Sequence, residues 1–275
     1  MKKLVTGALA LFAVGFSYAQ LNTTTTTQTG DLNKSIIAQA GMENSNTILQ
    51  DGNENKADVN QGGMLNINSI QEIQGNLNEV DIDQVGDRNR NTGTQRGNGN
   101  WAKTLQTGND NIVERLQRTD RNRGEATQTG DNNLARQMQR GSQNQAWSQQ
   151  TGNQNQALAD QDGNLNKGTI TQSGGNGNWT HINQFSSNNE STQTQTGSFN
   201  RSDNHQYDGG GHKGIGNQDG MNNTLRQYQY GSGNTANDLQ QGDWNKSDVT
   251  QNGGGQMHMG SQTGYENSII VTQGN

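Results

Sequence analysis

The chain has 275 residues, of which 25% are apolar, and its formal net charge at pH 7 is −6. An apolar share about half the usual value is too small for a conventional globular core. The acidic balance argues against a dedicated nucleic-acid-binding protein, and the net charge is lower than is typical of disordered chains. Two classes remain: a disordered polymer of low complexity, or an ordered array with a partly polar core.

The N-terminal segment, residues 1–19, has the pattern of a secretory signal peptide. Lys2 and Lys3 precede an apolar run over residues 4–16, and Ser17, Tyr18 and Ala19 end the segment. The apolar run is too short for a membrane-spanning helix. We therefore expect an exported mature chain that starts near Gln20. Because the sequence contains no Cys, backbone pairing and packing must hold this chain together without disulfides.

After a short Thr-rich segment, residues 20–27, the sequence is one long repeat. Gln recurs every eleven residues from Gln28 to Gln273, with Gly two residues after most of these Gln and Asn three residues after that Gly. A disordered chain sets no requirement for such spacing, so the repeat predicts one ordered domain over residues 28–275. Ile73 fills the one position that lacks Gln, and single-residue slips in the spacing lie near Ile73, Gln184 and Gln218.

Each eleven-residue unit predicts one β-strand and one bend. Residues 55–61 place Asn, Ala, Val and Gln on one side of an extended chain and Lys, Asp and Asn on the other, and residues 78–84 repeat this alternation. Strict alternation is typical of a strand with one buried face. Gly, often followed by Asp or Asn, allows the positive φ that a tight bend requires. We therefore expect strands of about seven residues joined by four-residue bends.

The repeat as a whole predicts an all-β fold, an amyloid-like β-solenoid. Pro is absent from the sequence, as expected if nearly every strand pairs on both sides, since Pro removes a donor from the ladder. Two strands and two bends make a coil of about 22 residues, and about eleven coils would form a rod about 50 Å long. A coil of three strands and 33 residues is an open alternative at this point. The inward residues expected to fill the core are Ala57, Ala102, Ala135, Ala146, Ala157, Ala159, Val59, Val80, Ile82 and Val113.

Gln and Asn recur at the strand ends, where each would lie above its counterpart in the next coil. We expect their side-chain amides to donate and accept along the axis as ladders, with Gly in the bends. The residues expected in these ladders and bends are Gln39, Gly41, Asn44, Gln50, Gly52, Asn55, Gln61, Gln84, Gly86, Asn89, Gln106, Gly108, Asn111, Gln128, Gly130, Asn133, Gln139, Gly141, Asn144, Gln150, Gly152, Asn155, Gln161, Gly163, Asn166, Gln195, Gly197, Asn200, Gln229, Gly231, Asn234, Gln262, Gly264 and Asn267.

The recurring spacing Gln-x-Gly-x-x-Asn, called the frame below, resembles the curlin repeat of bacterial curli fibres. The segment Gln50-x-Gly52-x-x-Asn55-x-Ala57-x3-Gln61 has every fixed residue of the second half of that repeat, and the similarity extends over essentially the whole repeat domain. Where the family usually begins one strand with Ser, this chain mostly has Asn. The departure leaves the Gln, Gly and Asn positions of the repeat intact.

The resemblance implies an extracellular functional amyloid. Such a subunit is secreted unfolded through an outer-membrane pore with the help of periplasmic chaperones, and it polymerises on the cell surface as a fimbria of the adhesive biofilm matrix. Its partners would be further copies of itself and a homologous nucleator or major subunit. The sequence leaves open which of these two roles the chain has.

Two other functions fit parts of the sequence. A monomeric β-solenoid adhesin, or another surface-binding rod such as an ice-binding protein, would share the coil but would not polymerise. Ice binding needs a regular array of Thr, which occurs only sporadically in this chain. A disordered, prion-like Asn/Gln tract is the third candidate, and the preserved eleven-residue register argues against it.

The sequence also contains patterns that resemble catalytic, cofactor or metal sites. Gly209-x-Gly211-x-x-Gly214 matches the dinucleotide-binding fingerprint, but it lacks the preceding buried strand and the following helix, so we expect an irregular bend and no cofactor. The sequence contains no cluster of Ser, His and Asp that would indicate a catalytic site, so we do not expect an enzyme. The four His fall in different repeat units, so we expect no metal site. His212 stands at an Asn position and His258 at an inward position, where an imidazole can replace an amide as a hydrogen-bonding group.

Two groups of outward residues could contact partners. Arg is concentrated between Arg88 and Arg140, where a basic surface could bind extracellular DNA or polysaccharide, although ordinary solvated charge is the simpler interpretation. Trp101, Trp147 and Trp179 fall at outward positions. We expect these rings to pack beside long side chains on the surface of the rod.

Overall fold

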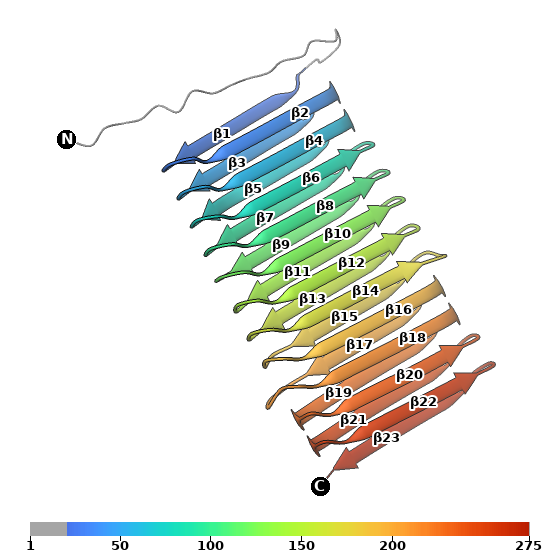
Figure 1. Cartoon of the computed structure of the whole chain (residues 1–275). Helices are drawn as coiled ribbons and strands as arrows, with labels where there is room; N and C mark the ends of the chain where they lie inside the picture. The colour runs from blue at the N-terminus through green and yellow to red at the C-terminus, as the bar shows by residue number, and fades with distance from the viewer. Residues whose placement is uncertain (1–20, 275) are drawn as a thin grey trace.

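The computed structural model describes residues 21–274 and shows a solenoid of two parallel β-sheets that face each other (Figure 1). Among the described residues, the odd-numbered strands form a 12-stranded sheet and the even-numbered strands an 11-stranded sheet. The expected signal peptide, residues 1–19, and Gln20 lie outside the described part of the chain. Between residues 21 and 274 there is no helix that could cross a membrane.

The odd sheet contains, in spatial order, β1 (Thr23–Thr29), β3 (Ser45–Asp51), β5 (Ile67–Gln74), β7 (Arg90–Arg96), β9 (Ile112–Arg118), β11 (Leu134–Arg140), β13 (Gln156–Asp162), β15 (Trp179–Gln184), β17 (Arg201–Gln206), β19 (Thr224–Ser232), β21 (Lys246–Gly254) and β23 (Ser268–Gly274). The even sheet contains β2 (Lys34–Met42), β4 (Lys56–Met64), β6 (Glu79–Val85), β8 (Trp101–Thr107), β10 (Arg123–Thr129), β12 (Gln145–Thr151), β14 (Lys167–Ser173), β16 (Glu190–Ser198), β18 (Lys213–Met221), β20 (Thr235–Gln241) and β22 (Met257–Thr263).

Each coil has two strands, which resolves the choice between coils of two and of three strands. Every strand pairs with the strand two places along the chain, so Glu125 of β10 lies between Lys103 of β8 and Trp147 of β12. Asp81 of β6 continues the same column, and its Oδ2 lies 3.5 Å from Nζ of Lys103. The expected 22-residue stacking is confirmed by these pairs.

The three slips in the spacing are absorbed locally. Ile73 pairs with Gln50 on one side and Gln95 on the other, so it takes the place of the missing Gln, and β5 is irregular just after Ile70. The other two extra residues lie in the bends before β15 and β18, and the pairing of these strands stays regular. The pairing of the strands therefore continues through all three slips.

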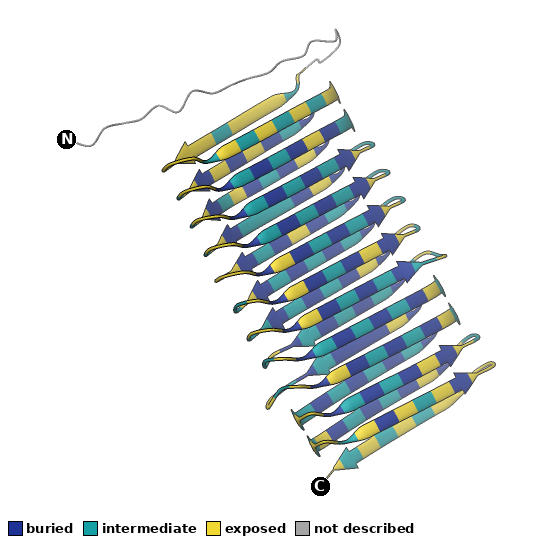
Figure 2. Ribbon diagram, viewed as in Figure 1, coloured by how far each residue is buried: buried dark blue, intermediate teal, exposed yellow. Residues whose placement is uncertain are grey.

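The alternation read from the sequence corresponds to burial in the structure. Buried residues alternate with more exposed ones along most inner strands, although not strictly in β7 and β17, whereas the first and last strands are largely exposed (Figure 2). All ten inward Ala, Val and Ile residues named above are buried, as expected. The Thr-rich residues Thr23 to Thr27, which we placed before the array, belong to β1 and pair with β3.

The side chain of Arg115 lies inside the solenoid, and this corrects the expectation that Arg between Arg88 and Arg140 is a surface feature. Arg115 is only 7% exposed, and its guanidinium donates to Oε1 of Gln137 and to the carbonyl oxygen of Lys103, both at 2.9 Å. Gly93, its neighbour in the column, leaves space for the long side chain. Burial lowers the pKa of Arg115 to about 10, so the group stays charged at neutral pH.

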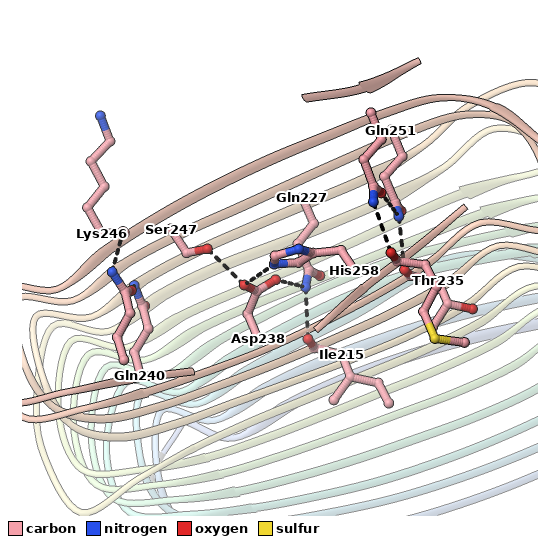
Figure 3. A network of polar contacts seen from close by, with 12 residues as sticks. Ile215, Gln227, Thr235, Asp238, Gln240, Lys246, Ser247, Gln251 and His258 are labelled. Atoms are coloured by element: carbon pink, nitrogen blue, oxygen red, sulfur yellow. Dashed lines mark hydrogen bonds and ion pairs between the residues drawn. The ribbon is translucent and has the colours of Figure 1, made fainter. Parts of the chain in front are cut away.

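Towards the C-terminal end the core becomes polar. Asp238 of β20 is 1% exposed and accepts hydrogen bonds from Nε2 of Gln227 and Oγ of Ser247, both at 2.8 Å (Figure 3). Nε2 of His258, at the inward position expected from the sequence, lies 3.1 Å from the same carboxylate. Gln227 also donates to the carbonyl oxygen of Ile215. This buried network gives each polar group at least one partner.

Candidate functional site

The Gln side chains form hydrogen-bonded columns parallel to the axis of the solenoid. Nε2 of Gln106 donates to Oε1 of Gln128 at 3.0 Å, and Nε2 of Gln128 donates to Oε1 of Gln150 at 2.9 Å. The odd sheet has its own column, in which Gln117 donates to Gln139 and Gln139 to Gln161. Each of these amides is buried, so the bonds are shielded from water.

The same Gln residues also connect the two sheets. Nε2 of Gln128, at the end of β10 in the even sheet, donates to the carbonyl oxygen of Ile112 at the start of β9 in the odd sheet, at 3.0 Å. Gln150 makes the equivalent bond to Leu134. Each Gln amide therefore uses one N–H along the axis and one across the coil. No apolar residue could satisfy that buried backbone carbonyl.

The Asn side chains form a second kind of column at the bends. The backbone N–H of Asn133 donates to Oδ1 of Asn111 at 3.1 Å, while Nδ2 of Asn111 donates to the carbonyl oxygen of Gly130 at 2.7 Å. An Asn in this position satisfies backbone groups of two neighbouring coils. His212 occupies one place in this column, where its Nδ1 accepts the backbone N–H of Asn234 at 3.3 Å. The expected replacement of an amide by imidazole is confirmed there.

Gly is required in the bends for two reasons. Gly108 has a φ of 112°, a conformation that L residues with a side chain rarely adopt. In addition, a Cβ atom on Gly108 would collide with the backbone carbonyl oxygen of Gly130 in the next coil. The sequence indicated the first reason, whereas the second follows only from the stacking. A substitution at such a Gly would push neighbouring coils apart.

A third column was missed from the sequence. The residue after the bend Gly accepts a backbone hydrogen bond from the previous coil: Asp87 N–H donates to Oδ1 of Asn109 at 2.9 Å, and Asn109 N–H donates to Oδ1 of Asp131 at 2.7 Å. The frequent Asp or Asn after Gly was the available signal, and we had assigned it to the bend alone. The column extends the inter-coil bonding to the tips of the bends.

The structure places all the expected ladder and bend residues in these columns. The Gln lie at inward positions near the strand ends, the Gly in bends with positive φ, and the Asn at the last position of each bend. The Gln and Asn are buried inside the array and less so in the end coils, where Gln39 is half-buried and Asn267 is exposed, whereas the bend Gly are half-buried or exposed. The columns thus run towards both ends of the described array, with one break in the Gln column of the odd sheet, where Ile73 stands between Gln50 and Gln95 and leaves Oε1 of Gln95 without a hydrogen bond.

Both ends of each sheet carry an edge strand. β1 and β23 have one neighbour each in the odd sheet, as do β2 and β22 in the even sheet. The side chains that point inward in these strands are partly uncovered: Ile37, Ile269 and Val271 are only half-buried. An edge strand with free N–H and C=O groups and uncovered apolar side chains is a template for a further strand.

The outward Trp residues pack beside cations, as expected. The guanidinium of Arg123 lies 4.4 Å from the ring centre of Trp101, and that of Arg201 lies 4.2 Å from the ring centre of Trp179. Both are pairs between neighbouring strands of one sheet. They stabilise adjacent coils through cation–π contacts.

The His residues are arranged differently from the expectation of scattered, unrelated positions. His181 of β15 pairs with Asp203 of β17, and His205 lies two residues further along β17 on the same outward face. The expectation failed because stacking brings together residues about one coil apart. Burial disfavours charge on His181, but the carboxylates of Asp160 and Asp203 outweigh this effect and raise the pKa of His181 to about 9.

The Gly209-x-Gly211-x-x-Gly214 pattern lies in the bend before β18 and at the beginning of that strand. Gly209 and Gly211 have positive φ. Gly214 points inward, where a Cβ atom would collide with the side chain of Asn204. The spacing thus serves a bend and a crowded position in the core, as the irregular-bend interpretation predicts.

Residues 22–51 match the family model described as the curlin associated repeat. No curated protein matches the chain. The matched residues include β1 and β3 and the complete first coil, and the columns that begin there continue in the same register to Gln273. Residues 22–51 are therefore similar to the curlin associated repeat.

Proposed function

We propose that this chain is a secreted structural subunit that polymerises end to end into curli-like amyloid fibres on a bacterial surface, where the fibres serve adhesion and biofilm matrix. The observation that carries the proposal is the pair of open ends. The curlin repeat supports a subunit of the curli type, and the edge strands give a physical route to the polymer. In this proposal the chain has a structural role and no catalytic one.

Stacking of a second copy would continue every interaction that already joins two coils. The backbone ladder, the Gln and Asn columns and the inward apolar side chains all reach the end strands. A new coil would bury Ile269 and Val271 on one copy and Ile37 on another. Each added copy presents the same kind of end again, so growth has no built-in stop.

A pair of variants tests whether the ends join as proposed. Val271→Asp puts a carboxylate on the inward side of β23, where a stacked copy would bury it without a partner, and such burial is strongly unfavourable. Ile270→Asp is the matched control, because Ile270 is 73% exposed on the outward side of the same strand. Assembly is followed by thioflavin fluorescence after dilution of the mature chain from denaturant.

We expect Val271→Asp to abolish or greatly delay assembly and Ile270→Asp to assemble much like the unchanged chain. Equal assembly rates for the two variants would contradict growth through this end. If the unchanged chain stays monomeric and rich in β-structure, the solenoid is kept but the function moves to the monomeric adhesin.

A further inference from the structure

A cluster of metal-ligating side chains lies on the outward face of the odd sheet. His181 of β15 and Asp203 of β17 are neighbours in one column, and His205 follows on the same face of β17. One donor atom from each of the three residues lies within 4.8 Å of the other two. The strands themselves hold these groups together, so no loop has to close to bring the donors into place.

The donor atoms converge on the carboxylate of Asp203. Nε2 of His205 lies 2.7 Å from Oδ1 of Asp203, and Nδ1 of His181 lies 3.5 Å from the same oxygen. The cluster is largely shielded from solvent: side-chain exposures are 20% for His181, 10% for Asp203 and 14% for His205. A shielded carboxylate between two imidazoles binds a cation more readily than a solvated surface group does.

The second nitrogen of each imidazole has its own polar neighbour. Nδ1 of His205 lies 2.9 Å from the hydroxyl of Tyr207, and Nε2 of His181 lies 3.6 Å from Oδ2 of Asp160. The Tyr207 hydroxyl is at hydrogen-bond distance from His205, and partners of this kind orient metal-binding histidines. Nε2 of His181 makes no hydrogen bond within the described part of the chain. Nε2 of His205 and Nδ1 of His181 are directed towards Asp203.

Aromatic packing restricts the orientation of both rings. His205 is stacked between Tyr207 and Tyr228, with ring centres 5.6 and 5.1 Å away. His181 packs edge-on against Trp179 and against His205. Rings held in this way lose little freedom when they bind a ligand, which favours binding.

We propose that His181, Asp203 and His205 form a binding site for one divalent transition-metal ion of the Zn²⁺ type. Two imidazoles and one carboxylate suit Zn²⁺ and Cu²⁺, whereas Mg²⁺ and Ca²⁺ require oxygen ligands. The donor atoms lie within 4.8 Å of one another, and bonds from Zn²⁺ to such donors are about 2 Å long. The carboxylates of Asp203 and nearby Asp160 offset the charge of the ion.

The site is complete within one chain, since β15 and β17 are consecutive strands of the odd sheet. It therefore does not depend on the proposed polymerisation, and the two proposals can fail separately. If the chain does polymerise, every copy along the fibre carries one such site.

Zn²⁺ titration of the folded mature chain by calorimetry tests the site. The variants are His181→Gln and His205→Gln, and the matched control is His212→Asn, which also removes a histidine but restores the Asn that the bend column normally contains. Circular dichroism establishes that each variant is folded. Cu²⁺ electron paramagnetic resonance counts the bound imidazole nitrogens, and Mg²⁺ serves as the hard-cation comparison.

We expect one Zn²⁺ per chain, binding weakened by about tenfold or more in each of the two Gln variants, and unchanged binding in His212→Asn. The Cu²⁺ spectrum should show two coordinated imidazoles, and Mg²⁺ should not compete. Zn²⁺ binding that is absent, or that is equal in the double variant His181→Gln/His205→Gln and the unchanged chain, would overturn the proposal.

Discussion

The coils from β3 to β8 and those from β16 to β22 have the same backbone but different cores. The first region contains a cluster of buried apolar residues that includes Ile48, Ile70 and Ile82. In the second region, inward positions hold Gln193, Asn204 and Asp238, and the side chain of each is hydrogen-bonded to that of Gln227. Gln227 also donates to the carbonyl oxygen of Ile215. The Gln, Gly and Asn frame is common to both.

The difference between the two regions shows that the frame determines the fold and the core chemistry is variable. A coil is closed by backbone pairing and by the amide columns, so its interior needs only to be filled and its polar groups satisfied. The N-terminal region meets this requirement with apolar packing and the C-terminal region with hydrogen bonds. We expect the two regions to respond differently to changes in the core and equally to changes in the frame.

The largest effect should follow from removal of the frame in the middle of the array. Replacing Gln139, Gln150 and Gln161 together with Leu leaves backbone carbonyls unpaired at three buried sites, and we expect a loss of about 6 kcal/mol in the free energy of unfolding, near 2 kcal/mol per site. Assembly should be slowed or abolished. The matched control replaces the exposed residues Gln145, Gln149 and Gln156. Similar unfolding midpoints in urea for the two triple variants would refute the register.

The next largest effect should come from a charge in the apolar region. Ile82→Asp places a carboxylate between Val59, which offers no donor, and Thr104, whose hydroxyl already donates to Asn91. We expect it to lower the free energy of unfolding by about 4 kcal/mol. Urea unfolding measures this loss. Asp81→Ile, on the outward side of the same strand, controls for the change in strand composition. If Ile82→Asp leaves the free energy of unfolding unchanged, the N-terminal core accepts a buried carboxylate as the C-terminal core does at Asp238, and the two cores do not differ in polarity as described.

A smaller loss is expected in the polar region. Asp238→Ala removes the acceptor of Gln227 and Ser247 and leaves both donors buried without it, and we expect a loss of about 2 kcal/mol. The double variant Asp238→Ala/Ser247→Ala should lose less than the sum of the two single changes, because the two groups share one interaction. Strict additivity in urea unfolding would argue against the network.

The smallest effect belongs to the outward face. Lys103 and Asp81 are separated by 3.5 Å and are both more than one-third exposed, so Lys103→Ala should change the free energy of unfolding by only about 0.3 kcal/mol. The change should shrink further in high salt. A loss comparable to that of Asp238→Ala would show that the outward columns contribute more to coil stacking than the present account allows.

The sequence was sufficient to predict the coil, its two faces and the positions of the columns. Strict alternation identified the inward side of each strand, and the eleven-residue spacing identified which residues stack. Both follow from local rules, the period of a strand and the geometry of a bend, and neither depends on what fills the core. The sequence left open whether a coil has two or three strands, and only the strand pairing in the structure decides between them.

Contacts between coils were harder to predict. Arg115 stands at an inward position by alternation, but its burial depends on space left by Gly93 in the neighbouring strand and on acceptors from Gln137 and Lys103. The cluster of His181, Asp203 and His205 likewise forms only after two coils have stacked. Such arrangements depend on several strands at once, whereas the frame repeats within each unit.

The most direct test of the central claim, that stacked coils continue from one copy to the next, is fibre diffraction from the mature chain after assembly from denaturant. We predict a meridional reflection at about 4.8 Å from the strand spacing and an equatorial reflection at about 10 Å from the two facing sheets. A product with β-structure but no fibres, or fibres in which the strands do not lie across the fibre axis, would contradict the account.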